Sequence, residues 1–133
     1  MTSFDLDFNM EPVFDGINHV GEQAMLDIVS KYGAEAFVDA LYGTSLTPST
    51  RATLIRLFAR VEPPPSKEVR LKLVEQSISS TSVEVRDAIV QAVELWEDPD
   101  AASILGEHQE VVPWLAEYIN AVVCELQEQP KQE

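Results

Sequence analysis

Apolar residues recur every three or four positions from residue 18 onward, which is the period of an amphipathic α-helix. Glycines and prolines interrupt this pattern at intervals, as they do at helix ends. Because the links between segments are short, neighbouring helices should pack antiparallel. We therefore expect an all-α fold of six or seven helices without a strand ladder. The pattern predicts helices over residues 18–32, 34–42, 48–61, 67–79, 82–97, 99–106 and 111–127.

Short polar residues mark the expected helix starts. Thr47, Ser66 and Asp98 each stand directly before a helical segment, where a side-chain oxygen can accept a hydrogen bond from a free backbone N–H group. A proline follows Thr47 and Asp98, at the first helical position that proline favours. Thr81 and Glu84 have the spacing of a capping box, so we expect Thr81 to cap the next helix. The inward face of the helix over residues 48–61 is expected to consist of Leu54, Leu57, Phe58 and Val61.

The first sixteen residues follow a different pattern. Apolar and polar side chains alternate over residues 4–10, which is the period of an extended strand. The segment could lie extended along a helical groove, form a short edge element, or be an acidic-aromatic arm that orders on a partner. We favour packing against its own domain. The predicted organisation is an extended acidic-aromatic arm over residues 1–16, a single helical domain over 17–128 and a disordered tail over 129–133.

Two windows of the sequence, 35 residues apart, resemble each other. The first is "TRATLIRLFARVEPP" over residues 50–64, and the second is "VRDAIVQAVELWEDP" over residues 85–99. Both windows have an arginine at the second position and a Glu-x-Pro exit, and their apolar positions coincide. A period of this length is typical of helical repeat proteins. The matched pairs are Arg51 with Arg86, Leu54 with Ile89, Ile55 with Val90, Phe58 with Val93, Val61 with Trp96, Glu62 with Glu97, and Pro64 with Pro99.

The second window also resembles the HEAT-repeat family, in its short bacterial form. That family has "VR-x-A" at the start of one helix and "D-P-x-A-x-x-x-L" at the start of the next. The resemblance covers residues 48–126 and implies antiparallel helical hairpins stacked as a short α-solenoid of about two and a half units. A helical bundle without repeats is the alternative. The residues that carry the resemblance are Val85, Arg86, Ala88, Asp98, Pro99, Ala101 and Leu105.

The charge is strongly acidic and unevenly distributed. The net charge is −14, whereas residues 46–80 carry six basic against three acidic residues. Such a surface repels nucleic acid and anionic lipid, so neither is an expected partner. It would attract a basic protein, although the acidity could serve solubility alone.

Candidate chemistry is sparse. His19 and His108 lie far apart in the sequence, and the single cysteine, Cys124, has no histidine or basic residue near it. We expect a solvated turn at His108 and a buried structural thiol at Cys124. The sequence has no GxSxG motif and no phosphate-binding glycine loop. These features predict a protein that is not an enzyme and that has no metal site and no cofactor.

The sequence also indicates a compartment. No apolar run reaches the ~20 residues that a membrane-spanning helix needs. Residues 1–10 lack the basic and apolar regions of a signal peptide. A single cysteine allows no internal disulfide. We therefore expect a cytoplasmic protein without a membrane partner.

Candidate partner-binding residues are acidic, aromatic and basic. Trp114 and Tyr42 are possible exposed anchors, because aromatic side chains are favoured at interfaces. Arg56, Arg60, Lys67, Arg70 and Lys72 could form one basic ridge. We prefer an intramolecular role for this ridge, facing acidic side chains of the flanking segments. The full set of candidates is Asp87, Glu94, Glu97, Asp98, Asp100, Glu107, Glu110, Glu117, Trp114, Arg56, Arg60, Phe4 and Phe8.

Three functions fit these features. The first is a non-catalytic protein-binding module, an adaptor or an inhibitor of the immunity-protein type, which binds a basic protein through its helical-repeat surface. The second is a small-ligand or chromophore-handling protein, since some short HEAT-like proteins resemble lyases that attach pigments. The third is a self-assembling structural subunit, possible as a homodimer.

Overall fold

The computed structural model describes the backbone of residues 15–127 and the side chains of residues 21 and 23–127. This part of the chain forms seven α-helices and contains no strand, which confirms the predicted all-α class. Residues 1–14 of the predicted arm and the predicted tail lie outside the described residues, and Asp15 begins the first helix. The helices are α2 (Asp15–Tyr32), α3 (Ala34–Gly43), α4 (Pro48–Ala59), α5 (Lys67–Ile78), α6 (Val83–Trp96), α7 (Pro99–Glu107) and α8 (Pro113–Gln127).

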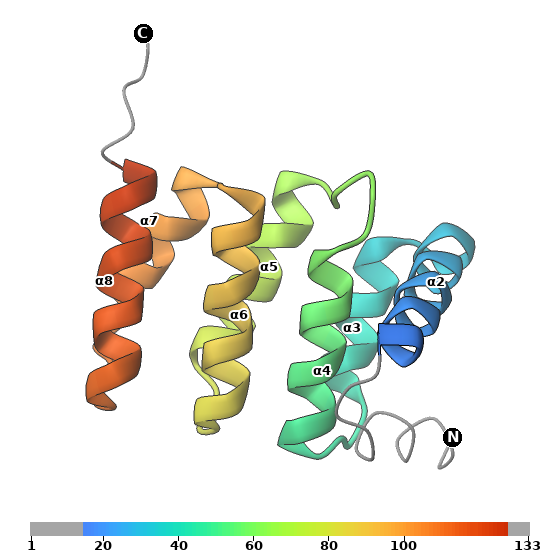
Figure 1. The fold of residues 1–133 in the computed structure, drawn as a ribbon, viewed down its shortest axis with the longest axis horizontal. Helices are drawn as coiled ribbons and strands as arrows, with labels where there is room; N and C mark the ends of the chain where they lie inside the picture. The colour runs from blue at the N-terminus through green and yellow to red at the C-terminus, as the bar shows by residue number, and fades with distance from the viewer. Residues whose placement is uncertain (1–14, 128–133) are drawn as a thin grey trace, which may run out of the picture.

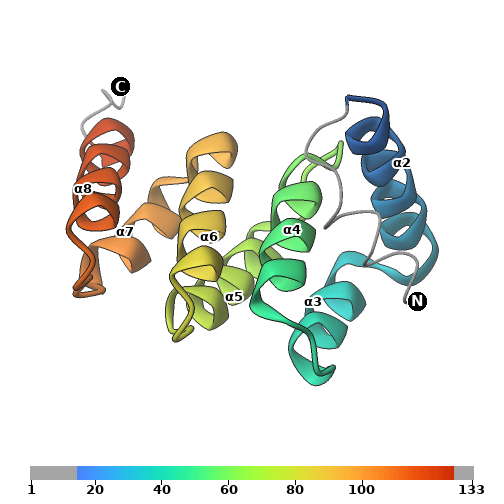
Figure 2. The same ribbon diagram turned by 60° about the horizontal axis from the view of Figure 1, so that its bottom comes forward.

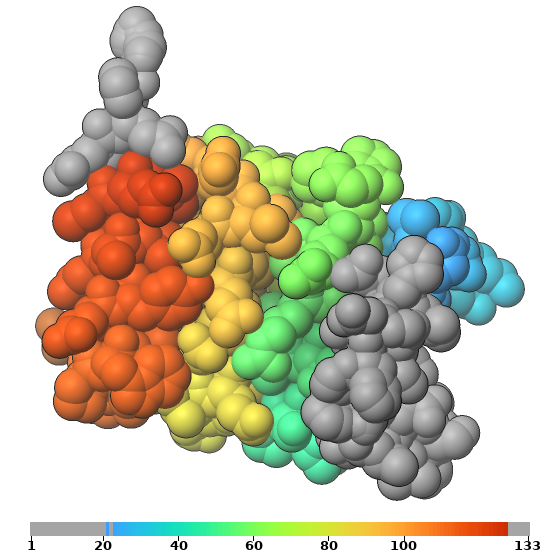
Figure 3. Space-filling model, in the orientation of Figure 1, coloured from blue at the N-terminus to red at the C-terminus, as the bar shows by residue number. Residues whose placement is uncertain are grey.

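The helices form two layers. Helices α4, α6 and α8 lie side by side in one layer, and α3, α5 and α7 lie in the other (Figures 1 and 2). Helix α5 packs antiparallel against α6, and α7 packs antiparallel against α8, as their short links predict. Helix α2 contacts α3 and α4 at one end of the molecule. One broad face is therefore made by α4, α6 and α8 (Figure 3).

A single apolar core runs between the layers. It extends from Met25 in α2 to Leu126 in α8, and every described helix contributes to it. Phe37 and Phe58 stack with ring centroids 4.8 Å apart, which joins α3 to α4. Ile55 is fully buried and was missing from the predicted inward face of α4, whereas Leu54 is partly buried and packs against the core. Helix α4 packs against both α2 and α6, and two neighbours bury a wider face than one.

Helix starts follow the predicted capping chemistry at three positions. Thr47 Oγ1 accepts a hydrogen bond from Thr50 N at 3.1 Å, and Ser66 Oγ accepts one from Val69 N at 3.4 Å. Asp98 Oδ1 accepts from the backbone N–H groups of residues 100 and 101, at 3.0 and 3.4 Å. Each cap satisfies a donor that the first helical turn leaves free.

One predicted helix cap and one predicted inward position were wrong. Ser82, and not Thr81, caps α6, since its Oγ accepts from Val85 N at 3.4 Å. Val111 was expected on the inner face of the last helix, but α8 begins at Pro113 and Val111 is 85% exposed. Proline has no N–H group to donate and favours the first helical position, which places the start of α8 at residue 113.

Candidate functional site

Polar side chains connect α4, α6 and α8 across the broad face. Arg56 Nε donates to Gln91 Oε1 at 3.2 Å, and Gln91 Nε2 donates to Asp87 Oδ2 at 3.0 Å. On the other side of α6, Tyr118 OH donates to Glu94 Oε1 at 2.6 Å. Burial, together with the nearby carboxylates of Glu94 and Asp87, raises the pKa of Tyr118, so the phenol stays protonated and remains a donor.

The eight candidate acidic residues separate by burial. Asp98 and Glu110 have side chains only 2% exposed, so they cannot contact a partner in this conformation. Asp87 is half-buried in the network just described. The acidic residues that remain exposed are Glu94, Glu97, Asp100, Glu107 and Glu117.

Glu110 joins α6 to the link between α7 and α8. Arg86 donates to both carboxylate oxygens, from Nε to Oε1 at 2.8 Å and from Nη2 to Oε2 at 2.9 Å. His108 Nε2 lies 2.9 Å from Oε1, and Val112 N donates to Oε2 at 3.0 Å. Burial alone would raise the pKa of Glu110, but these hydrogen bonds and the Arg86 charge lower it to about 2. Arg86 Nη1 also donates to Ser80 O at 2.9 Å.

The predicted basic ridge is engaged within the molecule. Lys67 pairs with Asp100, and Arg70 pairs with Asp98 at 3.0 Å. Lys72 Nζ lies 2.6 Å from Asp39 Oδ1 and also contacts Glu35. The predicted intramolecular role is confirmed for these three basic residues. The Arg56 ion pair is looser, with Nη2 3.8 Å from Asp87 Oδ2.

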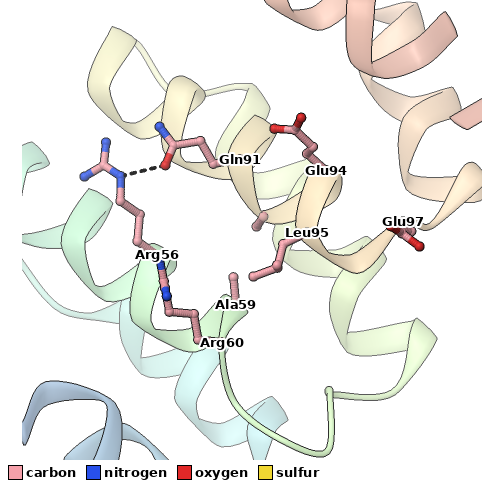
Figure 4. Close-up of a pocket in the computed structure, with 8 residues that line it drawn as sticks. Arg56, Ala59, Arg60, Gln91, Glu94, Leu95 and Glu97 are labelled. Carbon is pink, nitrogen blue, oxygen red and sulfur yellow. Dashed lines mark hydrogen bonds between the residues drawn. The ribbon is translucent and has the colours of Figure 1, made fainter. Parts of the chain in front are cut away.

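A groove lies between the C-terminal halves of α4 and α6. It has a volume of about 400 Å³ and continues into a hollow of about 270 Å³ that shares Ala59, Arg60 and Leu95 with it. Figure 4 shows Arg56 and Arg60 along the α4 side and Glu94 and Leu95 along the α6 side. Val61, Pro64 and Trp96 extend the apolar lining into the second hollow.

Two side chains of the groove stand out. Leu95, in the last turn of α6, is a large apolar residue that is 55% exposed. Trp96 Nε1 is buried but has no hydrogen-bond partner among the described residues. This groove was not predicted from the sequence. Leu95 lies beside the apolar stripe of α6 rather than on it. An apolar residue at such a position was the feature of the sequence that could have indicated the groove.

The two candidate aromatic anchors differ. Trp114, in the first turn of α8, is 55% exposed. Tyr42 is half-buried, with its OH 2.7 Å from Ser77 Oγ and the Arg51 guanidinium 5.0 Å from its ring centroid. Burial raises the pKa of Tyr42, although the Ser77 hydrogen bond and Arg51 oppose this. Trp114 is therefore the exposed member of the pair.

The expectation of a buried thiol at Cys124 was wrong, because Cys124 is exposed. Successive residues of an α-helix are ~100° apart around its axis, so Cys124 points away from a stripe that contains residues 122 and 126. The buried residues of α8 are Leu115, Ile119, Val122 and Leu126.

Phe4 and Phe8 lie outside the described residues. Within residues 15–127, the described side chains form no group of three or more histidine, cysteine or acidic residues that could hold a metal ion. Among the helices described, none is long and apolar enough to cross a membrane. Comparisons of the chain with family models, curated proteins and solved structures found no match.

Proposed function

We propose that this chain is a non-catalytic protein-binding module, built as a short HEAT-like stack of helical units, that binds a basic protein. Contacts between equivalent positions support the stack. Tyr42 contacts Ser77 and Arg56 contacts Gln91, and both pairs are separated by 35 residues, which is the offset of the two similar sequence windows. Units that repeat along an axis place equivalent residues next to each other.

The first arginines of the two windows also play equivalent roles. Arg51 donates to Leu41 O and Thr44 O, in and after the helix that precedes its own. Arg86 donates to Ser80 O, in the link that precedes its helix. Each arginine thus fixes the link before its own helix. This correspondence supports the repeat more strongly than the sequence resemblance does, because unrelated amphipathic helices have no reason to share it.

The proposed binding surface lies where α7 meets α8. We call it the anchor patch and define it as Glu107, Val111, Trp114 and Glu117. Val111 is 85% exposed and Trp114 is 55% exposed, and exposed carboxylates stand before and after them in the sequence. The exposure of Trp114, three residues before the exposed Glu117 on the same helix, is the observation that carries the proposal. Tryptophan contributes strongly to binding when an interface covers it, and carboxylates at the edge attract a basic partner.

The test compares binding by the full chain and its variants. The full-length protein is immobilised, proteins retained from a cell lysate at low and raised salt are identified, and their dissociation constants are measured. Trp114→Ala is expected to weaken binding by about thirtyfold, as ~2 kcal/mol implies. The double substitution Glu107→Lys with Glu117→Lys should weaken binding more strongly at low salt than at high salt, because salt screens interactions between exposed charges.

A matched control reverses two exposed acidic residues outside the anchor patch. Glu68 and Glu75 lie on α5, in the other layer, and are exposed. Glu68→Lys with Glu75→Lys changes the net charge by the same amount and should have a much smaller effect. Equal losses with both charge reversals would show that only total charge matters. Retention of the chain itself and of no other protein would contradict the proposal and indicate self-association.

A further inference from the structure

We propose that the groove between α4 and α6 is a docking site for an extended acidic-aromatic segment, and that its occupant is residues 1–14 of this chain. The groove is defined by the lining described above, with Ala59 and Leu95 at its centre. It is separate from the anchor patch, so this inference does not depend on the proposed function. Three features of the groove and of the sequence support this occupant.

The first feature is apolar complementarity. The groove exposes Leu95 and continues into a hollow lined by Val61, Pro64 and Trp96. Residues 4–10 read "FDLDFNM", in which every second residue is apolar. An extended chain of this sequence can place its apolar side chains on one side and its acidic ones on the other. Such a segment can cover Leu95 without burying its own carboxylates.

The second feature is charge. On α5, Lys67, Arg70 and Lys72 already have close acidic partners, at 2.6 to 3.0 Å for Lys72 and Arg70. Arg56 is the exception among the ion pairs of the described residues, at 3.8 Å from Asp87 with a side chain 38% exposed. Arg56 lines the α4 side of the groove, whereas Glu94 and Glu97 line the α6 side (Figure 4). Asp5 and Asp7 on the polar side of the segment are therefore expected to face Arg56 rather than the carboxylates on α6.

The third feature is reach. The segment joins α2 at Asp15, and α2 packs against α4, which forms one wall of the groove. Fourteen extended residues span up to ~46 Å, whereas α4, with 12 residues, is ~18 Å long. The segment can therefore reach any point along α4. A tethered segment also binds at a high effective concentration, so a modest intrinsic affinity is enough to keep it docked.

The test uses a photo-crosslinker in the full chain. Phe8 is replaced by p-benzoyl-phenylalanine, which keeps an aromatic ring at that position. The dilute protein is irradiated, and the crosslinked peptides are identified by mass spectrometry. The expected result is an intramolecular crosslink to residues 59–64 or 91–97.

Variants of the groove make this result specific. Leu95→Asp and Arg56→Glu should each lower the yield of the crosslink by about tenfold, because they remove the apolar contact and reverse the charge at residue 56. Both side chains are partly or largely exposed, so the fold should persist, as far-ultraviolet circular dichroism will show. Val111→Asp is the matched control. It puts the same charge on another exposed apolar position and should leave the yield unchanged.

Three results would overturn the inference. They are crosslinks only to other helices, no crosslink at all, and a yield that Leu95→Asp does not change. A crosslink between two chains that increases with protein concentration would place the segment in the groove of a second copy, and it would overturn the intramolecular assignment. None of these readouts needs the partner of the anchor patch. Failure here therefore leaves the proposed function standing, and failure of partner binding leaves this docking site standing.

Discussion

Arg86 and Glu110 show how single residues hold this fold together. Both side chains are at least 90% buried, and their hydrogen bonds leave neither charge without a partner. A buried ion pair contributes little compared with apolar residues of the same shape, but breaking it leaves a charge in the core. The pair therefore constrains which structure forms, because Glu110 can be buried only where Arg86 meets it.

The ionisation of Glu110 makes the stability of the protein depend on pH. Its pKa is about 2 in the fold against 4.5 as the ordinary value, so folding favours the charged form. The stability that this difference supplies is complete above pH ~4.5 and is lost as the pH falls towards 2. A difference of about 2.5 units corresponds to about 3 kcal/mol. Urea denaturation of the wild-type protein between pH 7 and pH 2 should show this loss.

Glu110→Gln tests the assignment. The variant should lose about 3 kcal/mol of unfolding free energy at pH 7, because Arg86 is left without its charged partner. It should also show a shallower loss of stability on acidification. Glu117→Gln is the control, since Glu117 is exposed and its change should stay within ~0.5 kcal/mol. The role given to Glu110 is wrong if its variant and the wild type lose stability in parallel on acidification.

At the scale of the helices, α7 is the element most dependent on its ends. It has nine residues, which is too short to be stable in isolation. Asp98 caps its first turn and at the same time accepts from Arg70 Nε on α5 at 3.1 Å. A single carboxylate thus starts α7 and positions it against α5.

Two substitutions at Asp98 separate these two roles. Asp98→Asn keeps a good capping side chain but removes the charge that pairs with Arg70, and should cost about 1–2 kcal/mol. Asp98→Ala removes both and should cost about 2–4 kcal/mol. Amide hydrogen exchange in α7 should accelerate more in the alanine variant. If Asp98→Ala costs no more than Asp100→Ala, an exposed neighbour, the double role is refuted.

Features with local causes could be predicted from the sequence. Thr47, Ser66 and Asp98 were identified as caps because capping involves residues only two or three positions apart. Thr81 and Ser82 offer adjacent hydroxyl groups, and the choice between them depends on where the helix begins. Local pattern could not make that choice.

Features that depend on packing could not be predicted. Asp98 and Glu110 were counted as surface acids, because their arginine partners lie 28 and 24 residues away in the sequence. The groove next to Leu95 depends on which faces of α4 and α6 meet. The exposure of Cys124 depends on which side of α8 lacks a neighbour among the described helices. Burial of a charge or exposure of an apolar residue is a property of the assembled helices.

For the whole molecule, the continuous core predicts cooperative unfolding. Buried residues connect α2 to α8 without a break, so no group of the described helices has a core of its own. Loss of packing at one end should therefore weaken the other end. Stacked units that interact only with their neighbours can unfold separately, so cooperative unfolding of the described helices is a testable expectation.

Phe58→Ala and Leu115→Ala test this coupling from opposite ends. Both side chains are fully buried, and the substitutions should cost about 3–5 and 2–5 kcal/mol. Each should shift one and the same unfolding transition, followed by circular dichroism and by the fluorescence of Trp96 and Trp114. Two separate transitions, each moved by only one of the variants, would show that the two halves unfold independently.

The order of the ion-pair partners along the sequence has a consequence for synthesis of the chain. Arg70 and Arg86 are made by the ribosome before the carboxylates of Asp98 and Glu110 that neutralise them. A nascent chain that ends near residue 97 contains Arg70 and Arg86, whose side chains are largely buried in the folded protein. It lacks the carboxylates of Asp98 and Glu110 that make this burial tolerable. We therefore expect α5 and α6 to stay loosely packed during translation until the residues up to 110 have left the exit tunnel. Newly made N-terminal helices would then depend on the next segment to emerge, and a ribosome that stalls in α6 would release a chain exposed to proteases.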